Sequence, residues 1–154
     1  MRALFLLLFL AACTTPAIYS QNPHTGVTLV GSRGHMLQSG LNASFEARAA
    51  LSKKGEEEAW RILTYVTRDD RNYPRIMSAW THGIELPYRR LDRRRAGCGS
   101  GCNRQEAGEI IASRRLFEIL SGSGLTFQLI GKRGTYTGHL PGSAFAEVLA
   151  KAGG

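Results

Sequence analysis

The chain lacks a membrane-spanning apolar run, and it lacks the short motifs of several common enzyme classes. Its opening apolar run, residues 3–10, is too short to cross a bilayer. No H-E-x-x-H or G-x-S-x-G motif is present. Gly131-Lys132 is not a phosphate-binding loop, because Thr126 stands where that motif needs glycine and Arg133 where it needs serine or threonine. The four histidines are scattered singly. We therefore expect no metal, no cofactor and no identifiable catalytic residue.

The opening apolar run ends in small residues before a cysteine, Leu10-Ala11-Ala12-Cys13. This pattern resembles the lipobox of bacterial lipoproteins. The resemblance implies that residues 1–12 are a signal peptide, that Cys13 carries diacylglycerol through a thioether, and that the new N-terminus is acylated. Several acyl chains would hold the protein on the membrane almost permanently. The remaining alternative is a conventional secretory signal with Cys13 as an ordinary thiol.

The lipobox resemblance also implies a location. Thr14 follows the cysteine, where Asp would favour the inner membrane in the well-studied lipoproteins. We therefore expect a lipid-anchored protein of the bacterial cell envelope, in the outer membrane and facing the periplasm. In composition, the rest of the chain resembles the small envelope lipoproteins of Gram-negative bacteria.

Acidic residues are scarce, with 12 against 20 lysines and arginines and a net charge of +8. A basic protein on a membrane is attracted to anionic lipid headgroups or to lipopolysaccharide phosphates. We expect no nucleic-acid partner, because an exported protein rarely meets nucleic acid. An envelope protein is the other partner that we expect.

Five arginines, Arg89, Arg90, Arg93, Arg94 and Arg95, stand within seven residues. A guanidinium binds phosphate at two points, so this run predicts a weak anion-binding site, to which Lys132 and Arg133 would add. The alternative is an edge strand whose charges prevent pairing with another sheet.

Cysteines are few, with three in the chain. With Cys13 used by the anchor, Cys98 and Cys102 remain for an oxidising compartment, and Gly97-Cys98-Gly99-Ser100-Gly101-Cys102 is flexible enough to bring both sulfurs together. This spacing predicts a structural disulfide that shapes a loop. A redox-active pair and a metal site remain alternatives.

The hydropathy pattern predicts an α+β fold, an antiparallel sheet with two short helices in the C-terminal third. A β-sandwich with a C-terminal helix is the alternative. Alternating apolar residues predict strands at residues 44–51 and 60–67, with a single helix as the competing interpretation, and a hairpin at residues 125–130 and 135–140. Residues 76–90 read as one or two strands, with Pro87 at an edge. Ser113 and Ser143 are expected helix caps. The expected organisation is a tether and loop over residues 13–43, in which residues 14–26 form the tether and residues 31–40 a loop, and one globular domain over residues 44–154.

Aromatic residues are few, at 8% of the chain. Trp60, Trp80, Phe117, Phe127 and Phe145 occupy apolar positions and are expected in the core, although exposure on one surface would allow a glycan-binding platform. We expect a non-enzymatic binding or structural role in the envelope. The alternative is a periplasmic enzyme, either a hydrolase or a thiol oxidoreductase.

Overall fold

The computed structural model describes residues 16–70, 72–96 and 103–153. Eleven strands and two helices lie in these residues. The strands are β1 (Ile18–Asn22), β2 (Val27–Gly31), β3 (His35–Ser39), β4 (Ala43–Lys54), β5 (Glu57–Arg68), β6 (Ile76–Thr81), β7 (Ile84–Leu86), β8 (Tyr88–Ala96), β9 (Asn103–Ala112), β10 (Leu125–Gly131) and β11 (Gly134–Leu140). The helices are α1 (Arg114–Ser123) and α2 (Gly142–Ala152).

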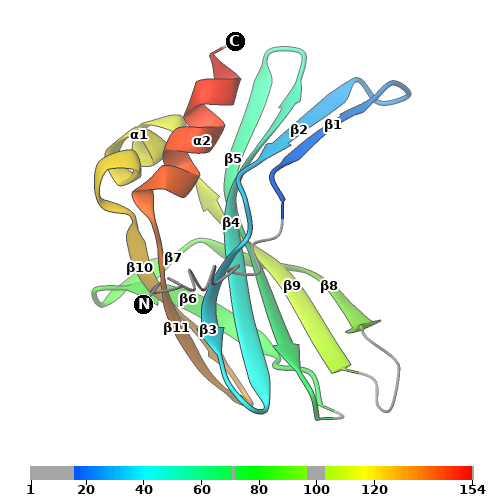
Figure 1. Cartoon of the computed structure of the whole chain (residues 1–154), viewed down its shortest axis with the longest axis vertical. Helices are drawn as coiled ribbons and strands as arrows, with labels where there is room; N and C mark the ends of the chain where they lie inside the picture. Colours follow the sequence, from blue (N-terminus) through cyan, green and yellow to red (C-terminus); the bar gives the residue numbers. More distant parts are fainter. Residues whose placement is uncertain (1–15, 71, 97–102, 154) are drawn as a thin grey trace, which may run out of the picture.

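The strands form two antiparallel sheets. The large sheet has the order β1-β2-β4-β5-β9-β8, with β3 also paired to β4, and the small sheet has the order β11-β10-β6-β7. The long β4–β5 hairpin forms the centre of the large sheet. In Figure 1 the helices lie beside the upper half of this hairpin and the small sheet lies beside its lower half.

One face of the β4–β5 hairpin carries most of the core. Phe45, Leu51, Ile62 and Val66 are buried, as period-two alternation requires for a strand with one covered face. The core has two parts, each with its own aromatic contacts. Phe45 meets Phe127 of the small sheet edge to face at 5.5 Å between ring centroids, while Trp60 meets Phe117 and Phe117 meets Phe145 of the helices at 5.1 Å each.

Two connections tie the sheets together. The chain passes from the small sheet to the large one at Pro87, whose carbonyl accepts a hydrogen bond from the amide of Ile111 at 2.9 Å. At the other side, β3 lies between β4 and β11, and the side chain of Gln38 accepts a hydrogen bond from the Thr137 amide at 3.3 Å. The two layers are therefore linked at both lateral sides.

Several sequence predictions are confirmed. The fold is antiparallel with two short helices near the C-terminus, although its two sheets and high strand content bring it close to the sandwich alternative. The hairpin of residues 44–67 forms instead of a helix, and the hairpin of residues 125–140 is present. Ser113 caps α1, because its hydroxyl accepts a hydrogen bond from the Leu116 amide.

Other predictions are wrong. Residues 31–40 are not only loop, because β3 pairs with β4 there, and the tether predicted through residue 26 is too long, because β1 pairs with β2. Ser143 does not cap α2, which begins at Gly142 with Pro141 at the cap and no side-chain hydrogen bond. Trp80 is half-buried rather than in the core, because it points away from the inner face of the small sheet.

No helix in residues 16–70, 72–96 or 103–153 has the length and apolar character needed to cross a membrane.

Candidate functional site: the arginine-rich strand β8

The arginine-rich run forms β8, an edge strand of the large sheet, as its alternative interpretation predicted. A β-bulge at Leu91, between Arg90 and Asp92, changes which side chains share a face. The register pairs Arg90 with Gly108 and Arg93 with Glu106, which lie on the face that carries the core. Arg89 pairs with Glu109 on the opposite, outer face. The arginines are therefore divided between two faces rather than gathered in one patch.

On the outer face, Arg89 is bound to a buried carboxylate. The Glu109 side chain is 1% exposed, and its two oxygens accept hydrogen bonds from Arg61 Nη1 at 3.2 Å and from Arg89 Nε at 2.8 Å. A buried carboxylate without cations would cost several kcal/mol. Arg61 and Arg89 thus neutralise Glu109. Arg94, on the same face, donates to the side-chain oxygen of Gln105.

On the core-bearing face, Arg93 is bound to a second buried carboxylate. Glu106 accepts a hydrogen bond from Arg93 Nε at 2.8 Å and from the backbone amides of Arg75 at 3.2 Å and Ile76 at 2.7 Å. Ile76 begins β6 of the small sheet, so Glu106 joins the two sheets. Arg75 has a φ of +53°, a conformation that side chains other than glycine adopt at a cost. The bond to Glu106 holds this strained turn.

Aromatic rings fix the arginines around Glu106. The Tyr73 ring has Arg93 at 5.7 Å and Arg104 at 5.6 Å from its centroid, both in cation–π range. Tyr88 is directed over Gly108, and burial raises the pKa of its hydroxyl to about 12, with the nearby Glu106 charge adding to the shift. Arg90 and Arg93 lie near this hydroxyl and act in the opposite direction. Tyr88 therefore stays protonated at any physiological pH.

The β10–β11 turn lies next to this region, which the sequence did not reveal. The amides of Lys132 and Arg133 donate to the carbonyls of Arg75 and Pro74 at 3.1 and 3.3 Å. Arg68 at the end of β5 donates to the Arg133 carbonyl at 2.8 Å.

The same Arg68 also binds Asp70 through two nitrogens. This hydrogen-bonded pairing lowers the pKa of Asp70 to about 2, despite an opposing contribution from desolvation, and raises that of Arg68. Asp70 is consequently a fixed negative charge that holds Arg68 against the β10–β11 turn.

We define the basic surface as five exposed cations that form no ion pair among the described residues and that lie on the core-bearing face of β8, just before β6, or in the β10–β11 turn. They are Arg75, Arg90, Arg95, Lys132 and Arg133. Arg90, Arg93 and Arg95 share one face of β8, while Arg75 links β8 to the β10–β11 turn through Glu106. Guanidinium and ammonium groups can contact phosphate or carboxylate groups on an extended anionic surface.

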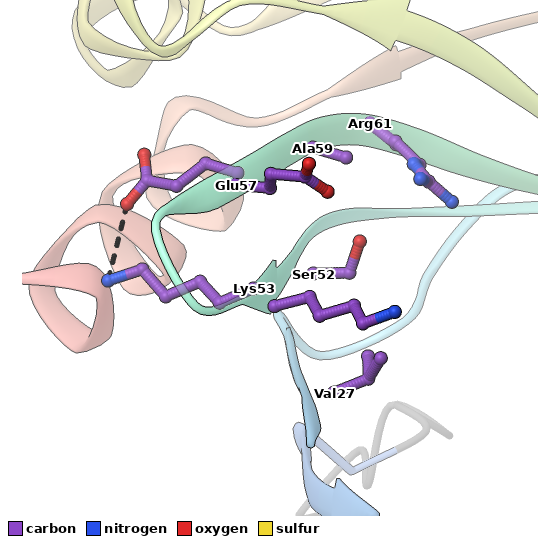
Figure 2. A pocket seen from close by; sticks show the side chains of 8 residues that line it. Val27, Ser52, Lys53, Glu57, Ala59 and Arg61 are labelled. Carbon is purple, nitrogen blue, oxygen red and sulfur yellow. Dashed lines mark ion pairs between the residues drawn. The ribbon is translucent and has the colours of Figure 1, made fainter. Parts of the chain in front are cut away.

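The hollow at the end of the β4–β5 hairpin has a different character. It has a volume of about 490 Å³ (Figure 2), and charges of both signs line it. Lys53 pairs with Glu58 at 3.3 Å, and its ammonium also donates to the Ala152 carbonyl at the end of α2 at 2.9 Å. Val27, Ser52 and Arg61 line the rest. Lys53 thereby fastens the hairpin to α2.

A second hollow, of about 420 Å³, bears on the enzyme alternative because His35, Ser143 and Glu147 all line it. Burial lowers the pKa of His35, although the nearby Glu147 charge opposes the shift. Glu147 accepts hydrogen bonds from the Arg33 amide at 3.1 Å and from Lys151 at 3.3 Å. No hydrogen bond joins the histidine, serine and glutamate in the described structure, so the geometry gives no sign of a relay that would activate a serine.

The other three histidines lie outside this hollow. His139 is exposed and bonded to Thr126, His82 lies in the β6–β7 turn, and His24 is exposed. No group of three potential metal ligands occurs among the described residues. Cys13, Cys98 and Cys102 lie outside those residues, so the predicted lipidation and disulfide stay predictions.

Comparison with known protein families, curated proteins and solved structures gives no match.

Sequence reasoning missed the residues that organise the site. Arg75 and Tyr73 carry no local signal, because their role depends on contacts with β8 and β9. Glu106 and Glu109 are the exception in part. Glu106 shares one face of β9 with Gly108 and Ile110, and Glu109 lies on the other face. Both carboxylates are buried, and buried carboxylates need cationic partners. The arginine run is the nearest source of them.

Proposed function

We propose that the protein is a lipid-anchored protein of the bacterial cell envelope with a non-enzymatic binding role. Cys13 carries the anchor in this proposal, and the basic surface contacts anionic components of the envelope, such as phospholipid or lipopolysaccharide phosphates. The sequence Leu10-Ala11-Ala12-Cys13 supports the anchor, and Thr14 supports an outer-membrane location.

One observation carries the binding role. The two buried carboxylates take up Arg61, Arg89 and Arg93, yet five cations remain exposed nearby without a carboxylate. Like charges at one end of a protein repel each other and reduce stability, so their retention favours an external anion. An anionic membrane attracts each nearby lysine or arginine by about 1 kcal/mol. Five such cations are enough for salt-dependent association of a tethered protein.

The binding role can be tested with residues 14–154, which carry neither the leader nor an acyl group, on vesicles with and without phosphatidylglycerol. The test variant changes Arg90, Arg95, Lys132 and Arg133 to serine. The Arg93 side chain is left intact, because its loss would leave the buried Glu106 carboxylate without its cation. A loss of stability could then not be separated from a loss of binding. We expect the affinity for anionic vesicles at low salt to fall by at least about tenfold.

The matched control changes four cations elsewhere to serine, so that net charge falls equally. Arg33, Lys54, Arg114 and Arg115 serve, since all four are exposed. This control should keep most of its affinity for anionic vesicles. Equal losses in both variants would mean that binding follows net charge alone and would reject the basic surface.

The anchor needs its own measurement. Mass spectrometry of the native protein should find a diacylated and N-acylated Cys13 as the first residue, and the Cys13→Ser chain should lack both modifications and keep residues 1–12. An intact leader on a soluble native protein would reject the anchor.

A further inference from the structure

The outer face of the small sheet is nearly uncharged, in contrast to the rest of the protein. Buried Tyr136, Phe127, Leu129 and Ala79 point inward, so the alternate residues point outward. Those outward residues are mainly hydroxyl, amide and imidazole groups, among them Thr135, Thr137, His139, Thr126 and Gln128. With histidine counted as neutral, Glu85 is the only charged residue in the four strands, within a chain of net charge +8.

An indole ring lies in the middle of this face. Trp80 is half-buried, and its Nε1 donates to Ser78 Oγ at 2.9 Å, two residues back on the same strand. This bond ties the indole to Ser78, which lies on the same face of β6. Across the strands, Thr137, Gln128, Trp80 and Glu85 form one continuous row. Polar groups therefore flank the indole on both sides.

A hollow of about 220 Å³ adjoins the indole. Trp80, His82, Thr126, Gln128 and Thr137 line it, with parts of the β6–β7 turn. Ordinary small-molecule pockets have volumes of roughly 300–1,000 Å³, so this hollow suits one ring of a longer ligand.

Hydrogen bonds hold the polar lining in place. Gln128 Nε2 donates to Thr137 Oγ1 at 3.0 Å, and Thr81 Oγ1 donates to the Thr126 carbonyl at 2.7 Å. Thr126 Oγ1 and His139 Nδ1 are 2.9 Å apart. Side chains that are already ordered lose little conformational entropy when they bind a ligand.

From this geometry we infer that the outer face of the small sheet binds a neutral glycan, with one pyranose ring stacked near Trp80. A pyranose presents C–H groups on one face, which pack against an indole, and hydroxyls at its rim, which suit amide, hydroxyl and carboxylate groups. The four strands of the small sheet contain no lysine or arginine to favour an anion, and the Glu85 carboxylate repels one. This site is separate from the basic surface and does not depend on the proposed anchor or on anion binding.

The test uses the full chain in detergent and three uncharged probes. Chitohexaose represents N-acetylhexosamine polymers, and maltohexaose and cellohexaose together represent plain hexose polymers. Binding is followed by calorimetry and by tryptophan fluorescence. Because Trp60 is 5% exposed in the core, a fluorescence change on binding should come from Trp80.

Two threonine variants and two Trp80 variants locate the site without disturbing the core. Thr137→Arg places a bulky cation in the hollow, whereas Thr135→Arg places the same cation on the same strand and face but outside the lining residues. We expect Thr137→Arg to weaken binding at least tenfold and Thr135→Arg to change it less than twofold. Trp80→Ala should also abolish binding, while Trp80→Phe, which keeps an aromatic face, should retain part of it.

Preference for chitohexaose or for the hexose polymers would identify the source of the glycan. Failure of all three probes to bind would overturn the inference. Binding that survives both Thr137→Arg and Trp80→Ala would overturn it as well, because the glycan would then lie elsewhere.

Discussion

Replacement of Glu106 should be among the most damaging single changes in the protein. Its carboxylate accepts hydrogen bonds from the Ile76 amide, the Arg75 amide and Arg93 Nε. Glu106→Leu leaves the two amides without an acceptor, at about 1–3 kcal/mol each. The Arg93 side chain is 33% exposed and can turn toward water, so its loss adds little. We therefore expect a decrease of about 4 kcal/mol in the free energy of unfolding, against a usual total of 5–15 kcal/mol.

A shape-conserving variant separates charge from hydrogen bonding. Glu106→Gln keeps one carbonyl oxygen, so it can still accept from the backbone, but its amide group then faces a donor. We expect a loss of about 2 kcal/mol. Urea unfolding followed by tryptophan fluorescence measures both variants. Asp92→Asn, an exposed carboxylate on the neighbouring strand, is the control and should change stability by under about 0.5 kcal/mol. If Glu106→Leu costs less than about 1 kcal/mol, Glu106 does not hold the sheets together.

Two glycines and one carboxylate give further predictions. Gly142→Ala should destabilise the protein, because the new Cβ would lie 2.5 Å from a backbone carbonyl oxygen of α1. Gly122→Ala has open space around it and should raise the free energy of unfolding by about 0.5 kcal/mol. Thermal melts of both variants compare their stability. Asp70→Asn should lower the melting temperature at pH 6, because pairing with Arg68 depresses the pKa of Asp70 from 3.8 to about 2. That contribution is fully present above about pH 4 and is lost as pH falls toward 2, so the melting temperatures of Asp70→Asn and of the unchanged protein should converge there. A difference that persists at pH 2 would contradict the pairing.

Local sequence patterns predicted the strands and helices that are defined by residues close together in the sequence. The alternation of Phe45, Ala47, Ala49 and Leu51 predicted the core-bearing face of β4, although Arg48 and Ala50 on its other face are buried as well. The cap at Ser113 was equally visible, because it needs only an adjacent helix. Strand β3 was missed, since its glycine- and serine-rich surroundings carry little hydropathy signal and its stability comes from partners on β4 and β11.

The candidate site shows the same division. The arginine run is obvious in the sequence, but the direction of each guanidinium depends on the bulge at Leu91 and on the register with β9. Those are long-range properties. The partners Glu106 and Glu109 and the approach of the β10–β11 turn to Arg75 follow only from the folded arrangement.

The β1–β2 hairpin has a mechanical consequence for an anchored protein. The chain enters at Ile18, which pairs with Gly31 at the open end of the hairpin, while the turn lies beyond Asn22. Under the proposed anchor, a pull from the membrane would load the ladder at that open end, so its hydrogen bonds would break one after another instead of resisting together. Since four of the five residues of β1 are exposed, little apolar area opposes this peeling. Release of the five residues of β1 would lengthen the connection between the domain and the proposed anchor by roughly 17 Å, while the core stays folded.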